Sequence, residues 1–142
     1  MQRALDTIEL LIASWILGGD DGNRMPASHG ILDRALKIAV DQGAFPPWFR
    51  DELHFVDSRV GLQCVELPEL LDWAQRALLT TAPNPSYHWA QVQVSSKAAR
   101  QILSDLDIDE GEAREWGRLL REAVVRVQEL MSTYPEPAIE EY

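Results

Sequence analysis

The sequence predicts a mainly helical α+β domain, and three observations lead to this prediction. Apolar residues recur at the three-to-four-residue spacing of amphipathic helices through most of the 142-residue chain. A few short segments alternate instead with the two-residue spacing of a strand. The content of 46% hydrophobic and 25% charged residues is that of an ordinary globular protein. We therefore expect one compact domain over residues 1–142, with about five helices, a small β-hairpin and one further short strand.

The first two predicted helices differ in how much of their surface is apolar. Residues 4–17 form a helix whose second half is apolar on nearly all sides, a pattern typical of a central helix or a subunit interface. Ser28 is expected to cap the second helix, which carries an apolar stripe to residue 42 and ends at Gly43. The first helix is the reason why we expect a homodimer.

A proline-containing corner and a hairpin follow these helices. Pro46 and Pro47 stiffen a corner with a single helical turn after it, ending at residue 52. Residues 53–57 and 60–67 alternate as the two strands of a hairpin. A helix over residues 68–79 completes this half of the chain.

The second half contains one strand and two helices. Residues 80–87 are rich in proline and threonine and predict a weak subdomain boundary. Residues 89–94 alternate strictly as a short strand, and residues 134–142 are expected to form a flexible tail. Two further helices, ending near residues 106 and 131, each follow residues that can cap a first turn: Ser95 or Ser96, and Asp107 or Asp109.

The charge balance restricts the class of partner. The chain has 13 Lys and Arg against 23 Asp and Glu, a formal net charge of -10, and the acidic excess is spread over both halves. Nucleic-acid-binding proteins usually present a basic stripe to the phosphates. The acidic composition therefore disfavours nucleic acid and anionic membranes, and it favours a basic protein partner.

Cellular location follows from two further features of the sequence. No apolar run reaches the length of a membrane span, and the first residues lack the basic start of a signal peptide. The single cysteine, Cys64, cannot form an internal disulfide. We expect a cytoplasmic protein without a membrane contact.

No motif points to a catalytic, metal or cofactor site. The three histidines and Cys64 lack the spacing of metal ligands. The acidic run 105–112 lacks the central glycine of a calcium loop, and the glycine-rich run 18–22 follows a helix and carries acids rather than Lys or Arg. We therefore expect a non-enzymatic protein without catalytic, metal-binding or cofactor-binding residues.

Aromatic residues supply the candidate partner-binding site. Trp15 and Trp116 fall on apolar helix faces and are expected in the core. Four other aromatic residues lie at the proline corner or on the polar side of the short strand: Phe45, Trp48, Phe49 and Trp89. Exposed aromatic side chains are favoured anchors of protein interfaces, whereas the alternative role is to cover the edges of the core.

These observations favour a regulatory or adaptor protein that binds a basic protein partner. Two alternatives stay open. The first is a winged-helix DNA-binding regulator with the hairpin at residues 53–67 as its wing, in which four basic residues would contact phosphates: Arg34, Lys37, Arg50 and Arg59. The second is a small-ligand-binding protein or an enzyme. The spacing of residues along the sequence cannot reveal the pocket of such a protein.

Overall fold

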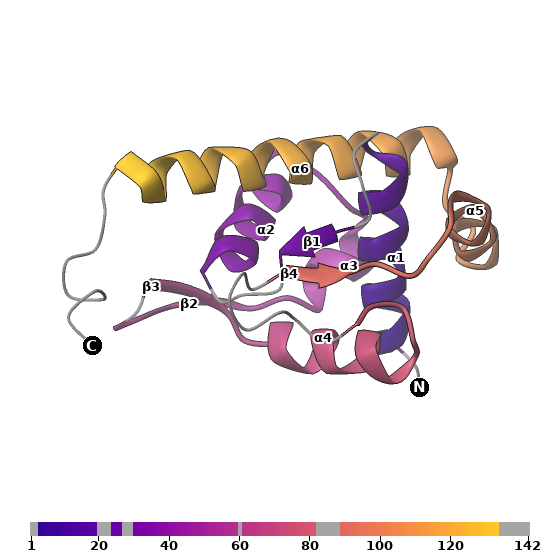
Figure 1. Cartoon of the computed structure of the whole chain (residues 1–142), viewed down its shortest axis with the longest axis horizontal. Helices are drawn as coiled ribbons and strands as arrows, with labels where there is room; N and C mark the ends of the chain where they lie inside the picture. Colours follow the sequence, from indigo (N-terminus) through magenta and orange to yellow (C-terminus); the bar gives the residue numbers. More distant parts are fainter. Residues whose placement is uncertain (1–2, 20–23, 27–29, 60, 82–88, 134–142) are drawn as a thin grey trace.

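The computed structural model describes residues 3–19, 24–26, 30–59, 61–81 and 89–133, and these residues confirm the mainly helical α+β class (Figure 1). Two small antiparallel strand pairs accompany the helices. The elements in chain order are α1 (Arg3–Leu17), β1 (Arg24–Pro26), α2 (Ile31–Asp41), α3 (Pro47–Asp51), β2 (Phe55–Ser58), β3 (Gly61–Cys64), α4 (Leu67–Arg76), β4 (Trp89–Gln91), α5 (Ser96–Asp105) and α6 (Glu110–Thr133).

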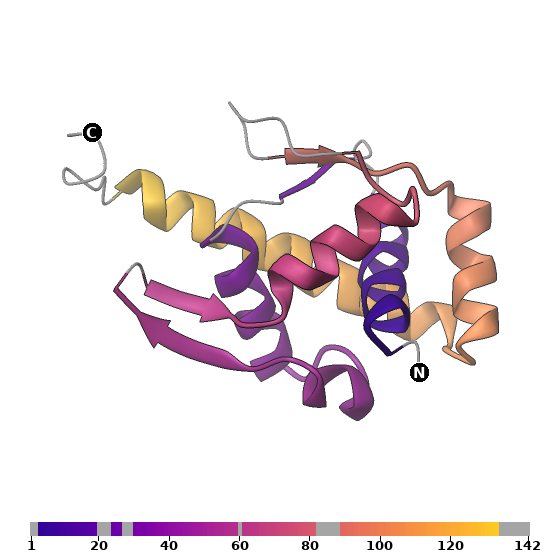
Figure 2. The ribbon, with the colours of Figure 1, turned by 90° about the horizontal axis from the view of Figure 1, so that it is seen from below.

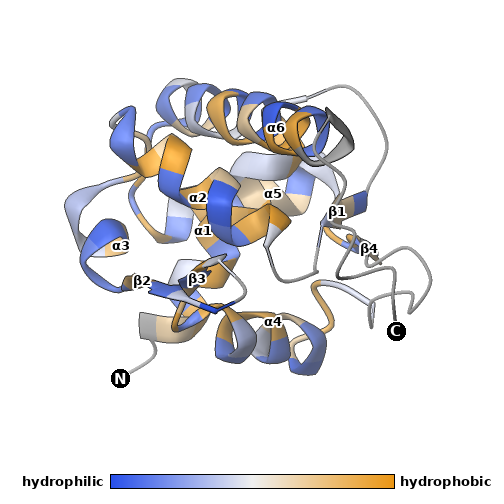
Figure 3. Ribbon diagram, turned by 90° about the vertical axis from the view of Figure 1, so that its left-hand side faces the viewer, coloured by the Kyte–Doolittle hydropathy of each residue, from blue (hydrophilic) through white to orange (hydrophobic). Residues whose placement is uncertain are grey.

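Helix α1 forms the centre of the molecule. Leu10, Leu11 and Ile12 are fully buried, and α4, α5 and α6 all pack against this helix (Figure 1). Helix α6 also covers α2, and hydrophobic residues gather where these helices face one another (Figure 3). The apolar second half of α1 is therefore covered by the chain itself. The observation that led us to expect a homodimer no longer requires one.

Helices α1 and α6 approach each other at two glycines. A Cβ atom added at Gly117 would overlap the carbonyl oxygen of Ser14, and one added at Gly18 would lie 2.5 Å from the carbonyl carbon of Gly117. Residues with side chains would hold the two backbones farther apart. The sequence thus permits a direct contact between the backbones of the two longest helices.

Two arginines of α6 bind the C-terminal end of α1. Arg121 donates from Nε to the carbonyl oxygen of Trp15 at 2.8 Å, and its guanidinium lies 4.4 Å from the centre of the Trp15 ring. Arg114 donates from Nη1 to the carbonyl oxygen of Leu17 at 3.1 Å. The last carbonyl groups of a helix have no partner within it, and the cations also complement the negative end of its dipole.

The predicted hairpin is confirmed with shorter strands, and it extends from the body beside α2 (Figure 2). The buried carboxylate of Asp33 in α2 joins the two elements. It accepts the backbone N–H of Cys64 at 2.8 Å and that of Gly30 at 3.3 Å. One side chain therefore satisfies a donor of β3 and a donor at the start of α2.

The strand expected at residues 89–94 is confirmed in part: β4 covers only Trp89–Gln91, where it pairs antiparallel with β1, and Val92 adds an isolated bridge to Thr80. The sequence did not predict β1. Two of the expected helix caps are confirmed: Ser95 accepts the N–H of Ala98, and Asp109 accepts that of Glu112.

Other expectations concern residues that the structure does not describe. Ser28 lies outside the described residues, and Gly30 occupies the N-cap position of α2 in place of the expected serine. Most of the boundary expected at residues 80–87 and all of the tail at 134–142 also lie outside them. Among the described helices, none combines the length and the apolar composition of a membrane span.

Gly117→Ala tests the contact between the backbones of α1 and α6. The added methyl group must separate the helices, so we expect a loss of about 3 kcal/mol of unfolding free energy. Gly111→Ala in the exposed first turn of α6 is the matched control: its Cβ would lie 3.1 Å from Oδ2 of Asp109, a side-chain atom that can shift slightly, so stability should change by less than about 1 kcal/mol. Equal denaturation midpoints for the two variants would contradict the close contact.

Asp33→Asn tests the junction of α2 and the hairpin. The two oxygens of Asp33 each accept a backbone N–H group. In asparagine an amide NH2 group replaces one of these oxygens, so one N–H group loses its acceptor. We expect the unfolding free energy, measured by chemical denaturation, to fall by about 1–3 kcal/mol. Asp41→Asn removes an exposed charge from the same helix, where it pairs with Lys37, and should cost less than about 1 kcal/mol. Equal losses would show that Asp33 has no special role.

Candidate functional site

The aromatic corner faces inward. Phe45 and Phe49 are each 1% exposed, and their rings stack with centres 4.2 Å apart. Phe45 also packs on Trp116 of α6, with 5.8 Å between the ring centres. The expectation that these two phenylalanines anchor a partner is therefore wrong. The turn at the prolines directs both rings into the core, where they are inaccessible.

The two tryptophans of the expected site have different outcomes. Trp48 is half-buried and lies edge-on to Phe49, with 6.3 Å between the ring centres. The backbone of Trp89 lies in β4, but its side chain lies outside the described part of the structure. The proposed role of Trp48 and Trp89 in partner binding stays a prediction.

The four basic residues of the DNA-binding alternative are not equally available for contacts with phosphates. Lys37 forms an ion pair with Asp41 at 2.7 Å, and Arg34 lies against Gly61 at the start of β3. Nε of Arg50 is buried without a hydrogen-bond partner, and Arg59 is exposed. Helix α3, which the winged-helix interpretation places at the DNA, has only five residues, too few to fill a major groove.

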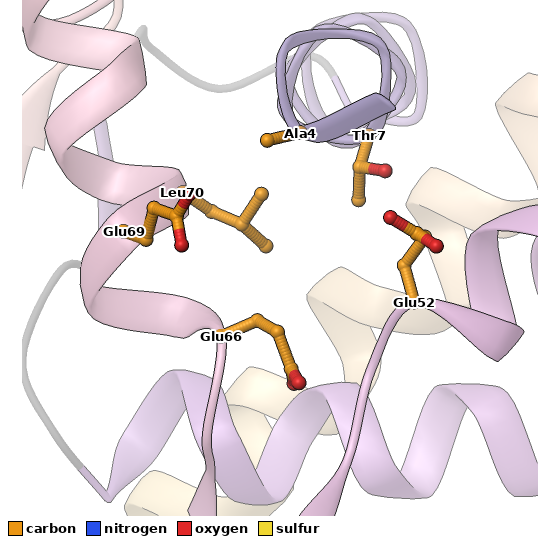
Figure 4. Close-up of a pocket in the computed structure, with 6 residues that line it drawn as sticks. All are labelled: Ala4, Thr7, Glu52, Glu66, Glu69 and Leu70. Atoms are coloured by element: carbon orange, nitrogen blue, oxygen red, sulfur yellow. The ribbon is translucent and has the colours of Figure 1, made fainter. Parts of the chain in front are cut away.

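A small acidic cavity of about 110 Å³ lies between α1, the end of α3 and the start of α4 (Figure 4). Glu52 follows α3, Glu66 is the N-cap residue of α4, and Glu69 lies in the first turn of α4. The remaining lining residues are Ala4, Thr7 and Leu70. Three carboxylates from two helix ends thus border one space whose other walls are largely apolar.

Local sequence places each glutamate at or near a helix end. Pro47 and Pro68 lie in the first turns of α3 and α4, where a missing N–H costs no helical bond. The backbone N–H of Glu52 ends α3 by donating to the carbonyl of Phe49 at 3.1 Å, and the carbonyl of Glu66 begins α4 by accepting the N–H of Leu70 at 3.0 Å. Both short helices therefore present acidic residues at ends that face α1.

The electrostatic environment of the cavity is negative. No Lys or Arg is among the described residues that line it. Glu66 accepts two bonds from His54 at its rim, one from the backbone N–H at 2.7 Å, while ring Nδ1 lies 2.6 Å from the other carboxylate oxygen. A cation entering the cavity would meet Glu52 and Glu69 directly and Glu66 in competition with His54.

A second acidic group lies where α1 meets α5. The pKa of Glu9 is raised above its ordinary value of 4.5, first by burial and then by the nearby charges of Asp6 and Asp105. Burial and the two neighbouring carboxylates therefore both oppose the ionisation of Glu9.

Many of the chain's cations are paired with its own acids. The ion pairs on the described surface include Lys37 with Asp41, Arg76 with Asp72, Arg100 and Arg114 with Glu110, and Arg118 with Glu115 and Glu122. Because acids exceed bases by ten, this pairing leaves the acidic excess on other parts of the surface.

Cys64 does not have the properties of a nucleophile. Its side chain is buried, and burial raises the pKa of its thiol to about 11; the charges of Glu66 and Asp33 also raise this pKa, whereas backbone hydrogen bonds at Glu66 and Leu67 lower it. A reactive cysteine needs an accessible thiolate at neutral pH. Across the described residues, no group of three or more His, Cys, Asp and Glu side chains is arranged to hold a metal ion.

Sequence reasoning did not find the cavity. None of Glu52, Glu66 and Glu69 was predicted to be a site residue. The proline in the first turn of each of these two helices was visible in the sequence, but nothing local indicated that both helix ends face α1. Comparison with protein-family models, with curated proteins and with solved structures gave no match.

Glu9→Gln tests the acidic group at α1 and α5. Because the pKa of Glu9 is raised in the folded state, folding favours its protonated form, and stability falls as pH rises above about 4.5. The variant should be more stable than the wild type at pH 7, by less than about 1 kcal/mol after solvent screening, with no difference near pH 3.

The control is Glu112→Gln, in the first turn of α6, where the helix dipole favours a negative charge. It should leave stability at pH 7 unchanged or slightly lower it. Thermal melts of both variants at the two pH values make the comparison. A loss of stability in Glu9→Gln at pH 7 would show that its charge is favourable.

Proposed function

We propose that this is a non-enzymatic regulatory or adaptor protein that binds a basic protein partner, and that the acidic cavity takes a cationic side chain of that partner. One observation carries the proposal: Glu52, Glu66 and Glu69 border a single cavity, with no Lys or Arg among its described lining residues. A partner's lysine or arginine would supply the missing positive charge.

The size and the walls of the cavity suit one side chain. Its volume of about 110 Å³ is below the roughly 300–1,000 Å³ of typical small-molecule pockets. Ala4 and Leu70 offer apolar surface to the methylene groups of a lysine or arginine, and the carboxylates face its charged end. These features support recognition of a protein side chain rather than a separate ligand.

The charge of the whole molecule supports the same class of partner. A net charge of -10 attracts a basic protein over a distance and raises its association rate. The internal ion pairs neutralise many of the cations that would otherwise repel such a partner. A cytoplasmic location is part of this proposal, and the free, buried Cys64 is compatible with it.

The partner in this proposal is a different protein. A homodimer formed through α1 would need an exposed apolar face, and α1 is covered by α4, α5 and α6. A second copy would also bring a like charge of -10.

DNA binding is the competing function. Arg50 and Arg59 form no ion pair within the described residues, and the hairpin extends from the body, as a wing would (Figure 2). The five-residue α3 and the strongly acidic composition weigh against it. Duplex DNA therefore belongs in the binding test as the second probe.

The test compares two double variants that remove the same charge. Glu52→Gln with Glu69→Gln changes the cavity, whereas Asp107→Asn with Glu112→Gln changes exposed sites around the start of α6. The probe is a six-residue lysine peptide, measured by calorimetry at about 20 mM salt, where screening is weak.

We expect the cavity variant to bind the peptide about thirtyfold more weakly, because each of the two lost charges contributes about 1 kcal/mol at contact distance in water. The control should change affinity less than about twofold, since its charges act only over a distance. Equal losses in both variants would mean that net charge alone determines binding. Tight binding of the DNA duplex would overturn the proposal.

A further inference from the structure

The rim of the acidic cavity contains a titratable contact. His54 lies between α3 and β2, with 68% of its side chain exposed, whereas the side chain of Glu66 is 27% exposed. The two oxygens of Glu66 bind different parts of this one residue, the backbone N–H at 2.7 Å and ring Nδ1 at 2.6 Å. The carboxylate that lines the cavity is therefore the one that contacts the imidazole.

The contact can persist in both charge states of the histidine. A neutral imidazole with its hydrogen on Nδ1 donates to the carboxylate, and an imidazolium donates from the same atom. Proton uptake therefore adds a positive charge beside Glu66 without any required movement. An imidazole ordinarily gains this proton between pH 5 and 8.

We propose that His54 makes the acidic cavity a pH-responsive site, in which the protonated imidazole neutralises Glu66 and weakens the binding of a partner's cationic side chain. This inference rests on the proposed function. While His54 is neutral, three uncompensated carboxylates face the cavity. When His54 is protonated, only two of them remain uncompensated. The proton and the partner's cation then compete for one carboxylate, so each reduces the affinity for the other.

The neighbouring groups leave this role to His54. Glu52 and Glu69 complete the acidic lining, and within the described part of the chain no hydrogen bond from His54 to either of them accompanies its two bonds to Glu66. Cys64 on β3, whose sulfur is 3.9 Å from Glu66 Oε1, stays a neutral thiol because burial raises its pKa to about 11. Asp33 faces the backbone N–H of Cys64 rather than the cavity.

The test measures binding of the six-residue lysine peptide near pH 7.5 and pH 5.5, on either side of the ordinary imidazole titration. Lysine side chains stay charged throughout this range. His54→Gln keeps the backbone N–H and offers an amide donor to Glu66, but it cannot take up the proton. His88→Gln removes another imidazole and serves as the control.

We expect the wild type and the control to bind about threefold more weakly at the lower pH, and His54→Gln to lose most of this difference. Calorimetry in two buffers of different ionisation enthalpy supplies a second readout near pH 6. Peptide binding should release protons from the wild type and few from His54→Gln. Circular dichroism melts of each variant check the fold, and His54→Asn is the replacement where His54→Gln unfolds.

The outcomes separate the inference from the function on which it rests. Peptide binding that depends on Glu52 and Glu69, but changes equally with pH in the wild type and in His54→Gln, overturns the pH response alone. If the peptide binds the cavity variant as tightly as the wild type, the proposed function is overturned, and the pH response with it.

Discussion

The backbone contact between α1 and α6 is the constraint on which the other contacts depend. Gly18 and Gly117 let the two helices meet without intervening side chains, and Arg114 and Arg121 then bind the last carbonyls of α1. With this side of α1 closed by α6, its other sides receive α4 and α5. The acidic cavity exists because α4 and the end of α3 meet the N-terminal turns of a helix whose position is already fixed.

Two carboxylates bind backbone N–H groups at the base of the hairpin. Asp33 accepts the backbone N–H of Cys64 at the end of β3, and Glu66 accepts that of His54 just before β2. Each replaces a bond that a longer sheet would have supplied from a neighbouring strand. The two differ in burial, since Asp33 is enclosed while Glu66 keeps part of its surface open. Asp33 can therefore act only within the fold, whereas Glu66 can also contact a partner.

Local patterns predicted those features that local chemistry determines. The spacing of apolar residues located the long helices, and Ser95 and Asp109 marked two helix starts because a side-chain oxygen next to a first turn has a defined partner. The inward direction of Phe45 and Phe49 was missed because exposure depends on what packs above a corner, here Trp116. The cavity was missed because its three glutamates lie on segments that only the tertiary fold brings together.

The pairing of β1 with β4 has a consequence for how the chain folds. These three-residue strands come from opposite sides of a long stretch that contains α2, α3, the hairpin and α4. Joining them early would cost the closure entropy of that entire loop in return for a few hydrogen bonds. The intervening helices must therefore collapse first. The pairing should form after the rate-limiting step of folding, so it slows unfolding more than it speeds folding.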